Sequence, residues 1–135
     1  MASDRIRRNR SKERVVVLDS SAAMMPFEFM IDLEDELIRI LGKFHIIVTS
    51  SVYDELVFLS KEGGGRKKRL AKPALELIKD YEKIKTVGNA DDSVLNLAVQ
   101  MDGIVLTNDK ELRKRVKEKN LKTIYLRGKQ KLVLE

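Results

Sequence analysis

The segment VVVLDSS, residues 15–21, decides the fold that the sequence predicts. Three valines and a leucine in succession are typical of a strand that is buried on both faces, as strands are in a parallel sheet. The strand ends on Asp19 and two serines. Ligands of open α/β sheets bind just beyond the carboxyl ends of the strands. Asp19 is therefore the first candidate functional residue, provided that other strands end in the same way.

Apolar strands and amphipathic helices alternate along the rest of the chain. We expect a loop at 20–27 that contains Pro26, and a flexible basic loop behind the glycine hinge at 63–65. The predicted strands are 14–18, 45–48, 84–87 (an edge strand), 104–107 and 123–126, and the predicted helices are 29–41, 50–60, 73–83, 91–101 and 110–119. This alternation gives an α/β fold, a five-stranded parallel sheet with helices on both faces.

The 135 residues fit one domain. We expect a disordered basic arm at 1–13, the folded domain at 14–127 and a basic C-terminal tail at 128–135. No apolar run is long enough for a membrane span, and the charged N-terminus does not resemble a secretory signal. The expected location is therefore cytoplasmic.

The composition removes several kinds of chemistry. The chain has no cysteine, which excludes thiol nucleophiles, disulfides and cysteine-based zinc sites. Its single histidine, His45, lies within a strand pattern, where a packed or edge side chain is expected rather than a catalytic one. Catalysis by this chain must therefore use carboxylates, hydroxyls, lysines or a metal ion.

Positive charge is concentrated in three segments. The net charge is +6, and basic residues outnumber acidic ones in 1–14, 61–72 and 110–131. Basic blocks of this kind indicate a polyanionic partner, most often a nucleic acid, although a lysine-rich solvated surface is the alternative. The residues expected to seat phosphates are Arg66, Lys67, Lys68, Arg69, Arg113 and Lys114.

Acidic residues recur where predicted strands give way to helices. They are Asp19, Asp54 and Glu55, Asp91 and Asp92, and Asp109. Helix capping is an alternative explanation for Glu55, Asp91 and Asp109, but not for Asp19, because no helix pattern follows it directly. Four carboxylates at one sheet edge repel one another unless a hard cation such as Mg²⁺ or Mn²⁺ neutralises them.

The order and spacing of these motifs resemble those of PIN-domain nucleases. The motifs are VVVLDSS, VTSSVYDEL, NADDSVLNLA and IVLTNDKELRKR, and the resemblance covers residues 14–127. It implies a three-layer PIN-like fold and metal-dependent cleavage of RNA. By position it assigns catalysis and metal binding to Asp19, Glu55, Asp91 and Asp109, with Ser20, Ser21 and Thr107 in support. Asp91 is preferred to Asp92 because a gap-free count back from Asp109 reaches it.

Within that family the chain looks most like the ribosome-biogenesis branch of archaea and eukaryotes. The implied substrate is precursor ribosomal RNA, and the implied partners are ribosome-assembly factors or a second copy of the chain. A toxin-type ribonuclease of a toxin–antitoxin pair is the enzymatic alternative, and a non-cleaving RNA-binding scaffold is the alternative without catalysis. A phosphatase or phospho-acceptor domain is disfavoured, because a DxD pair would place an acid where Ser21 stands.

Overall fold

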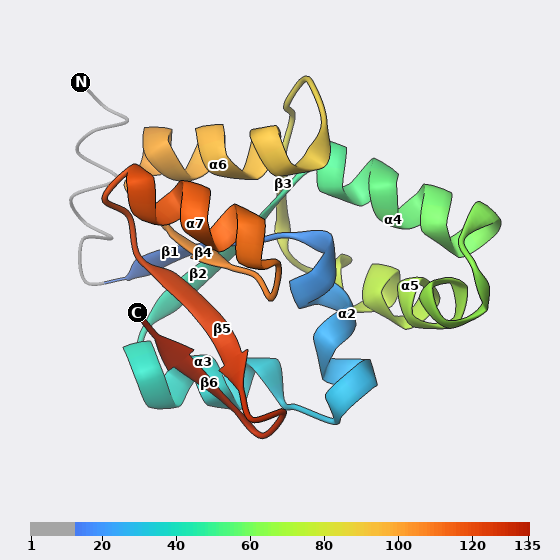
Figure 1. Cartoon of the computed structure of the whole chain (residues 1–135), viewed down its shortest axis with the longest axis horizontal. Coiled ribbons are helices and arrows are strands. Elements are labelled where there is room, and N and C mark those ends of the chain that lie inside the picture. Colours follow the sequence, from blue (N-terminus) through green and yellow to red (C-terminus); the bar gives the residue numbers. More distant parts are fainter. Residues whose placement is uncertain (1–12) are drawn as a thin grey trace.

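The protein, seen in a computed structural model that describes residues 13–135, is an α/β fold built on one sheet (Figure 1). The strands are β1 (Arg14–Leu18), β2 (Phe44–Thr49), β3 (Glu82–Ile84), β4 (Ile104–Leu106), β5 (Thr123–Arg127) and β6 (Lys131–Leu134). The helices are α2 (Ser20–Phe29), α3 (Leu33–Leu41), α4 (Ser50–Glu62), α5 (Gly65–Ile78), α6 (Ala90–Met101) and α7 (Lys110–Glu118). Helices α6 and α7 lie above the sheet in Figure 1 and α3 lies below it.

The strand order is β3-β2-β1-β4-β5-β6, and every neighbouring pair is parallel except β5 and β6. The chain moves outward from β1 through β2 to β3, and then crosses back to β4 and moves outward in the opposite direction. The order therefore reverses between β1 and β4, which is where open α/β sheets form a crevice at their carboxyl ends. Val16, Val17 and Leu18 of β1 are fully buried, as expected for a central strand.

Polar caps place four helix N-termini beside this crevice. Asp19 caps α2, Thr49 caps α4, Asn89 caps α6 and Asp109 caps α7, each by accepting a backbone N–H of its own helix. Asp19 directly follows β1, Thr49 is the last residue of β2 and Asp109 comes shortly after β4, so these three helices begin at the same edge of the sheet.

The predicted loop at 20–27 is a helix. Residues 22–25 (AAMM) of α2 are buried, and that apolar burial outweighs the helix-breaking tendency of Pro26 in the last turns. The helix ends at Met30, which adopts a left-handed conformation with φ of 56°. A helix therefore does follow Asp19 directly, contrary to the sequence-based expectation.

The predicted basic loop at 66–69 is also helical. Helix α5 begins at Gly65 and runs through Pro73 to Ile78, because Ala71, Ala74 and Ile78 are spaced to bury one face. Arg66 forms an ion pair with Glu28 at the end of α2, which ties the start of α5 to that helix.

The sheet has six strands rather than five, because part of the predicted C-terminal tail forms β6. Leu132 is fully buried opposite Leu126, and the side chains of Glu36 and Arg39 bind the backbone N–H and carbonyl of Leu132 at 2.8 Å each. The predicted edge strand is at the edge, as β3, although it begins two residues earlier than expected. Apart from Glu13, the predicted N-terminal arm lies outside the described residues.

Candidate active site

The first acid, Asp19, is buried at the point where the strand order reverses. Its Oδ1 accepts the backbone N–H of Ala22 and the hydroxyl of Ser21, each at 2.8 Å. Its Oδ2 accepts the hydroxyl of Thr107, which follows β4. Asp19 is thus a helix cap and also a bridge between the ends of β1 and β4. The sequence argument that capping could not account for Asp19 is wrong, because it placed no helix there.

Burial raises the pKa of Asp19 to about 6. The hydrogen bonds from Thr107, Ala22 and Ser21 act in the opposite direction, and the charge of Asp91 adds to the rise. An isolated carboxylate that is shielded from water and faces another acid is unfavourable in its charged form. The site therefore favours either a proton or a cation at Asp19.

Asp91, at the start of α6, is the acid that faces the others. Burial raises its pKa, and so do the nearby charges of Asp109 and Glu55, while Arg115 lowers it. The charge of Asp91 in turn raises the pKa of Asp19, so acids from four strand-to-helix junctions lie close enough to affect one another. The structure therefore gathers Asp19, Glu55, Asp91 and Asp109 at one edge of the sheet.

Asp92 is directed elsewhere. Its Oδ1 accepts the guanidinium Nη2 of Arg115 at 2.7 Å, and its Oδ2 accepts the amide of Asn89 at 3.0 Å. The bond from Arg115 lowers the pKa of Asp92. Neighbouring residues on a helix project about 100° apart, so the side chains of Asp91 and Asp92 lie near different residues. The geometry favours Asp91 as the third acid of the cluster.

Hydroxyl groups orient the remaining two acids. The Ser20 hydroxyl donates to Oε1 of Glu55, which lies in the second turn of α4. Oδ1 of Asp109 caps α7, while the Asp109 backbone N–H donates to the Thr107 hydroxyl at 3.0 Å. Thr107 is therefore bonded to both Asp19 and Asp109. The three supporting residues expected from the sequence all contact the acids or each other.

The donor atoms suit a hard divalent cation, because the cluster offers carboxylate and hydroxyl oxygens with no nitrogen or sulfur. Within residues 13–135, however, no three acidic or histidine side chains stand in the arrangement of a finished metal site. Like charges without a cation separate, and Asp19, Glu55 and Asp109 each have an oxygen held by a neighbouring hydroxyl or N–H.

The predicted phosphate-binding residues fall in two places. Arg66, Lys67, Lys68 and Arg69 are exposed on the first turns of α5. On α7, Lys114 is exposed, but the guanidinium of Arg113 stacks 3.5 Å from the centroid of the Tyr125 ring. Its Nε is buried and has no hydrogen-bond partner among the described residues. Arg113 is thus a packing residue of the α7–β5 contact, which does not suit it for phosphate binding.

Three residues near the acids were missed in the sequence. Arg115 reaches the start of α6 and Asn89 caps that helix. The side-chain Oδ1 of Asn108 accepts the Leu126 N–H at 3.0 Å, which ties the β4–α7 loop to β5. The sequence GNADD contains a recognisable capping signal for Asn89. Arg115 and Asn108 have no local signal, because their partners lie 18 to 23 positions away.

The chain is similar to known ribonucleases along nearly its whole length. Ribonuclease VapC9 of Archaeoglobus fulgidus is 31% identical over 135 residues, which is 100% of this chain and 98% of that protein. Ribonuclease VapC4 of Methanocaldococcus jannaschii is 32% identical over 119 residues, which is 84% of this chain and 91% of that protein.

Solved structures share the fold. The PIN domain endonuclease Utp24 has a TM-score of 0.76 at 24% identity, with 92% of each chain covered. The VapBC2 complex of Rickettsia felis, bound to a DNA fragment from its promoter, has a chain with a TM-score of 0.58 at 17% identity, covering 84% of this chain and 99% of that one.

No helix within residues 13–135 is both long and apolar enough to cross a membrane. A family model described as a PIN-like domain matches residues 16–129, most of the chain and all four of the acids described above. With a mostly parallel sheet flanked by helices and acids at its carboxyl edge, the chain belongs to the PIN-like domain family.

Proposed function

We propose that this protein is a metal-dependent endoribonuclease. The observation that carries the proposal is that Asp91 lies near enough to Glu55 and Asp109 for their charges to raise its pKa, while its own charge raises the pKa of the buried Asp19 carboxyl. Such a concentration of like charge is costly unless a cation binds there. Similarity to two proteins named ribonucleases over at least 84% of the chain supports RNA as the substrate.

Asp19, Glu55, Asp91 and Asp109 would hold one or more Mg²⁺ or Mn²⁺ ions. When bound at carboxylates, such an ion activates water and stabilises charge on a phosphate. The protein's own contribution is to hold the carboxylates in place. Thr107 fixes Asp19 and Asp109 together, and Ser20 restrains Glu55.

Arg115 is the cation best placed to meet the RNA phosphate. Its charge lowers the pKa of Asp91, so it lies near the acids, and Asp92 holds it by one guanidinium nitrogen. The Arg115 side chain remains 42% exposed, which leaves room for a ligand to reach the other guanidinium donors. Arg115 would position a phosphate and fix its orientation without reading sequence.

The favoured substrate is precursor ribosomal RNA, with ribosome-assembly factors as partners. The sequence features that suggest it are the basic segment after α4 and the ending of the chain, and the fold likeness to Utp24 agrees with it. A second candidate is a toxin-type ribonuclease with an antitoxin partner. Both sequence relatives carry VapC names, and a VapBC complex shares the fold.

A cleavage assay tests the endoribonuclease proposal. Wild type is incubated with labelled single-stranded and structured RNA in Mn²⁺, Mg²⁺ or EDTA, in parallel with Asp19→Asn. We expect cleavage with Mn²⁺ or Mg²⁺, none in EDTA, and none with Asp19→Asn. RNA binding without cleavage under every metal condition would instead identify a non-cleaving scaffold.

The two biological roles make different predictions in cells. Induced expression of a toxin-type enzyme arrests growth unless its antitoxin is present, and Asp19→Asn removes the arrest. Depletion of a ribosomal RNA processing enzyme causes uncut precursor to accumulate, which a blot for precursor ends detects. Accumulation of uncut precursor without growth arrest supports precursor ribosomal RNA as the substrate. Growth arrest without accumulation of precursor supports a toxin-type ribonuclease.

A further inference from the structure

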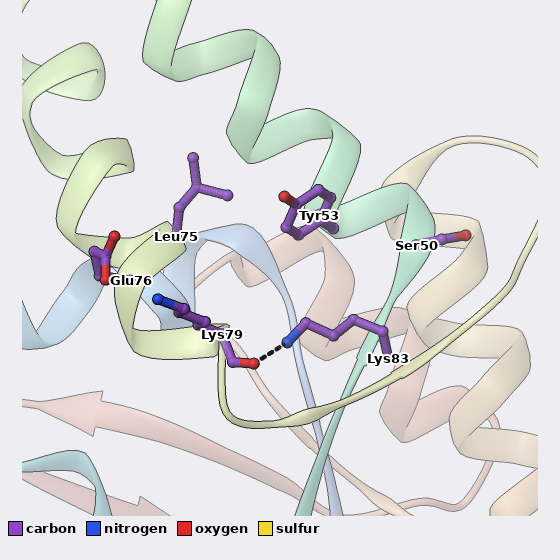
Figure 2. A pocket seen from close by; sticks show the side chains of 6 residues that line it. All are labelled: Ser50, Tyr53, Leu75, Glu76, Lys79 and Lys83. Atoms are coloured by element: carbon purple, nitrogen blue, oxygen red, sulfur yellow. Dashed lines mark hydrogen bonds between the residues drawn. The ribbon is translucent and has the colours of Figure 1, made fainter.

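A cavity of about 530 Å³ lies beside α4, between that helix, the end of α5 and the edge strand β3 (Figure 2). Its lining residues are Ser50, Tyr53, Leu75, Glu76, Lys79 and Lys83. None of them belongs to the acid cluster. Cavities of roughly 300–1,000 Å³ are the size that small ligands occupy in proteins.

The lining combines a flat apolar surface with polar groups. The ring of Tyr53 is 40% exposed, and in Figure 2 it lies across the cavity from Leu75 and Glu76. Glu76 offers a carboxylate, and in the described part of the chain neither Glu76 nor Lys79 forms an ion pair. An open aromatic face beside an acceptor and a cation suits a nucleobase with its phosphate.

Lys83 makes one wall of the cavity rigid and positive. Its ammonium donates to the carbonyls of Ile78, Lys79 and Tyr81, at 2.6 Å for Lys79 and 2.9 Å for Tyr81. The ammonium is held there by the free carbonyls at the end of α5. With two lysines and one glutamate, the lining carries a net positive charge, which complements a polyanion.

The cavity and the acid cluster lie on opposite sides of the same helix. Tyr53 and Glu55 are two positions apart, so they project about 200° from each other around α4. Ser50, which lines the cavity, is the first residue of α4 and follows β2 at the carboxyl edge of the sheet. The Ser50 end of the cavity therefore lies at the same carboxyl edge of the sheet as the acids.

We propose that this cavity binds one nucleotide of a single-stranded RNA, flanking the position of cleavage, with its base stacked on Tyr53 and its phosphate near Lys79. The inference rests on the proposed function, because it assumes that RNA is the substrate. The cavity would be a subsite that limits the enzyme to RNA that is unpaired on the side of the cleavage position that the cavity binds. A base that is still paired in a duplex cannot turn into a cavity of this kind.

The experiment measures RNA binding in the absence of cutting. Full-length protein carrying Asp19→Asn is titrated, in EDTA, with a single-stranded RNA that has 2-aminopurine at successive positions. Stacking on an aromatic ring quenches this base. Tyr53→Ala is compared with Tyr53→Phe, which keeps the ring, and with Phe58→Ala. Phe58 is an exposed aromatic residue of the same helix, 60% exposed, that does not line the cavity.

We expect quenching at one position of the RNA, lost in Tyr53→Ala and retained in Tyr53→Phe and Phe58→Ala. Tyr53→Ala should also weaken RNA binding about fivefold or more, the lower end of what stacking one base contributes. Lys79→Ala should lower the slope of log K against log salt by about 0.7. Thermal unfolding of each variant checks that the fold is kept, which is expected for a partly exposed tyrosine.

Equal RNA affinity and equal quenching in Tyr53→Ala and Phe58→Ala would overturn the inference. Saturation by a free mononucleotide that does not compete with RNA would also overturn it, since the cavity would then be a separate nucleotide site. Loss of self-association in Tyr53→Ala with unchanged RNA binding would assign the cavity to a protein interface instead. These results are separable from the proposed function, because wild-type cleavage is measured without reference to Tyr53.

Discussion

Arg115 on α7 and Asp92 on α6 are joined by an ion pair with an Nη2–Oδ1 distance of 2.7 Å. The pair connects the helices that follow β4 and β3, and it takes up the second of two adjacent acids. Asp91, one position earlier, instead lies near Glu55 and Asp109, whose charges raise its pKa. The two neighbouring carboxylates of this motif thus have different partners: Asp91 belongs to the acid cluster, whereas Asp92 binds Arg115.

Asp91→Asn is expected to reduce cleavage far more than Asp92→Asn. Asp91→Asn removes the charge of a proposed metal ligand, so we expect the cleavage rate to fall at least about a hundredfold. Loss of a residue that only supports a metal ligand costs about a hundredfold at most. Asp92→Asn should cost about tenfold or less, because it only releases Arg115. Initial rates at saturating Mn²⁺ and RNA measure both. Equal losses, or the reverse order, would show that the third acid has been misassigned.

Asp19→Asn is expected to stabilise the metal-free protein at neutral pH. The pKa of Asp19 in the folded state, about 6, lies above the 3.8 of a free aspartate, so folding favours the protonated form. The contribution of the protonated Asp19 carboxyl to the free energy of unfolding is fully present below about pH 4 and is lost as the pH rises through 6. An uncharged asparagine avoids this loss and still caps a helix well.

The expected gain in the free energy of unfolding is on the order of 3 kcal/mol at pH 7.5, with little difference at pH 4. Urea titrations in EDTA at the two pH values measure it. Asp92→Asn is the matched control, for which we expect a lower free energy of unfolding at pH 7.5. The pKa of Asp92 is lowered by its bond from Arg115, so its charged form stabilises the fold at that pH. A variant of Asp19 that is no more stable at pH 7.5 than wild type would contradict the burial argument.

Thr107→Val should impair catalysis, whereas Thr107→Ser should largely preserve it. The Thr107 hydroxyl is buried, donates to Asp19 and accepts from the Asp109 N–H, so valine keeps the shape but leaves two partners unpaired. The expected cost in stability is about 1–3 kcal/mol. Since this bond is the largest effect lowering the Asp19 pKa, its loss moves the acidic limb of the pH–rate profile to higher pH. An unshifted pH–rate profile in Thr107→Val would show that Thr107 does not control the pKa of Asp19.

Replacing Lys67, Lys68 and Arg69 with alanine should weaken RNA binding while leaving cleavage at saturating RNA intact. Successive residues of a helix project about 100° apart, so the three cations cannot all face one strand. We expect the slope of log K against log salt to fall by about 0.7–1.4, equivalent to one or two phosphate contacts on single-stranded RNA. Titrations of labelled RNA at several salt concentrations measure the slope.

Arg66→Ala is the control for that series, because Arg66 is already paired with Glu28. It should change stability by at most about 1 kcal/mol, as partly exposed ion pairs do, with a smaller effect on the salt slope. Parallel salt lines for wild type and the triple variant would exclude α5 from the RNA path. The exposed lysines of α7, Lys114 among them, would then be the better candidates.

The sequence by itself determined the sheet and the edge at which the acids gather. Buried strands such as residues 15–18 are recognisable because burial on both faces requires an unbroken apolar run, which is a local property. The parallel order then follows from the alternation with helices, and parallel strands end at one edge. The position of Asp19 at the end of a strand could therefore be predicted, as could the expectation that Asp91 rather than Asp92 belongs with Asp109.

Only the tertiary structure decided what these residues contact. Residues 20–29 form a helix because their apolar side chains are buried in the core, which outweighs the local effect of Pro26. The basic residues 66–69 are helical because the positions that follow them bury one face of α5. Residues 131–134 form a strand because they pair with β5 and bury Leu132. The bonds from Thr107 to Asp19 and from Arg115 to Asp92 join residues 88 and 23 positions apart. Such contacts depend on the packing of whole elements, which no local pattern of residues encodes.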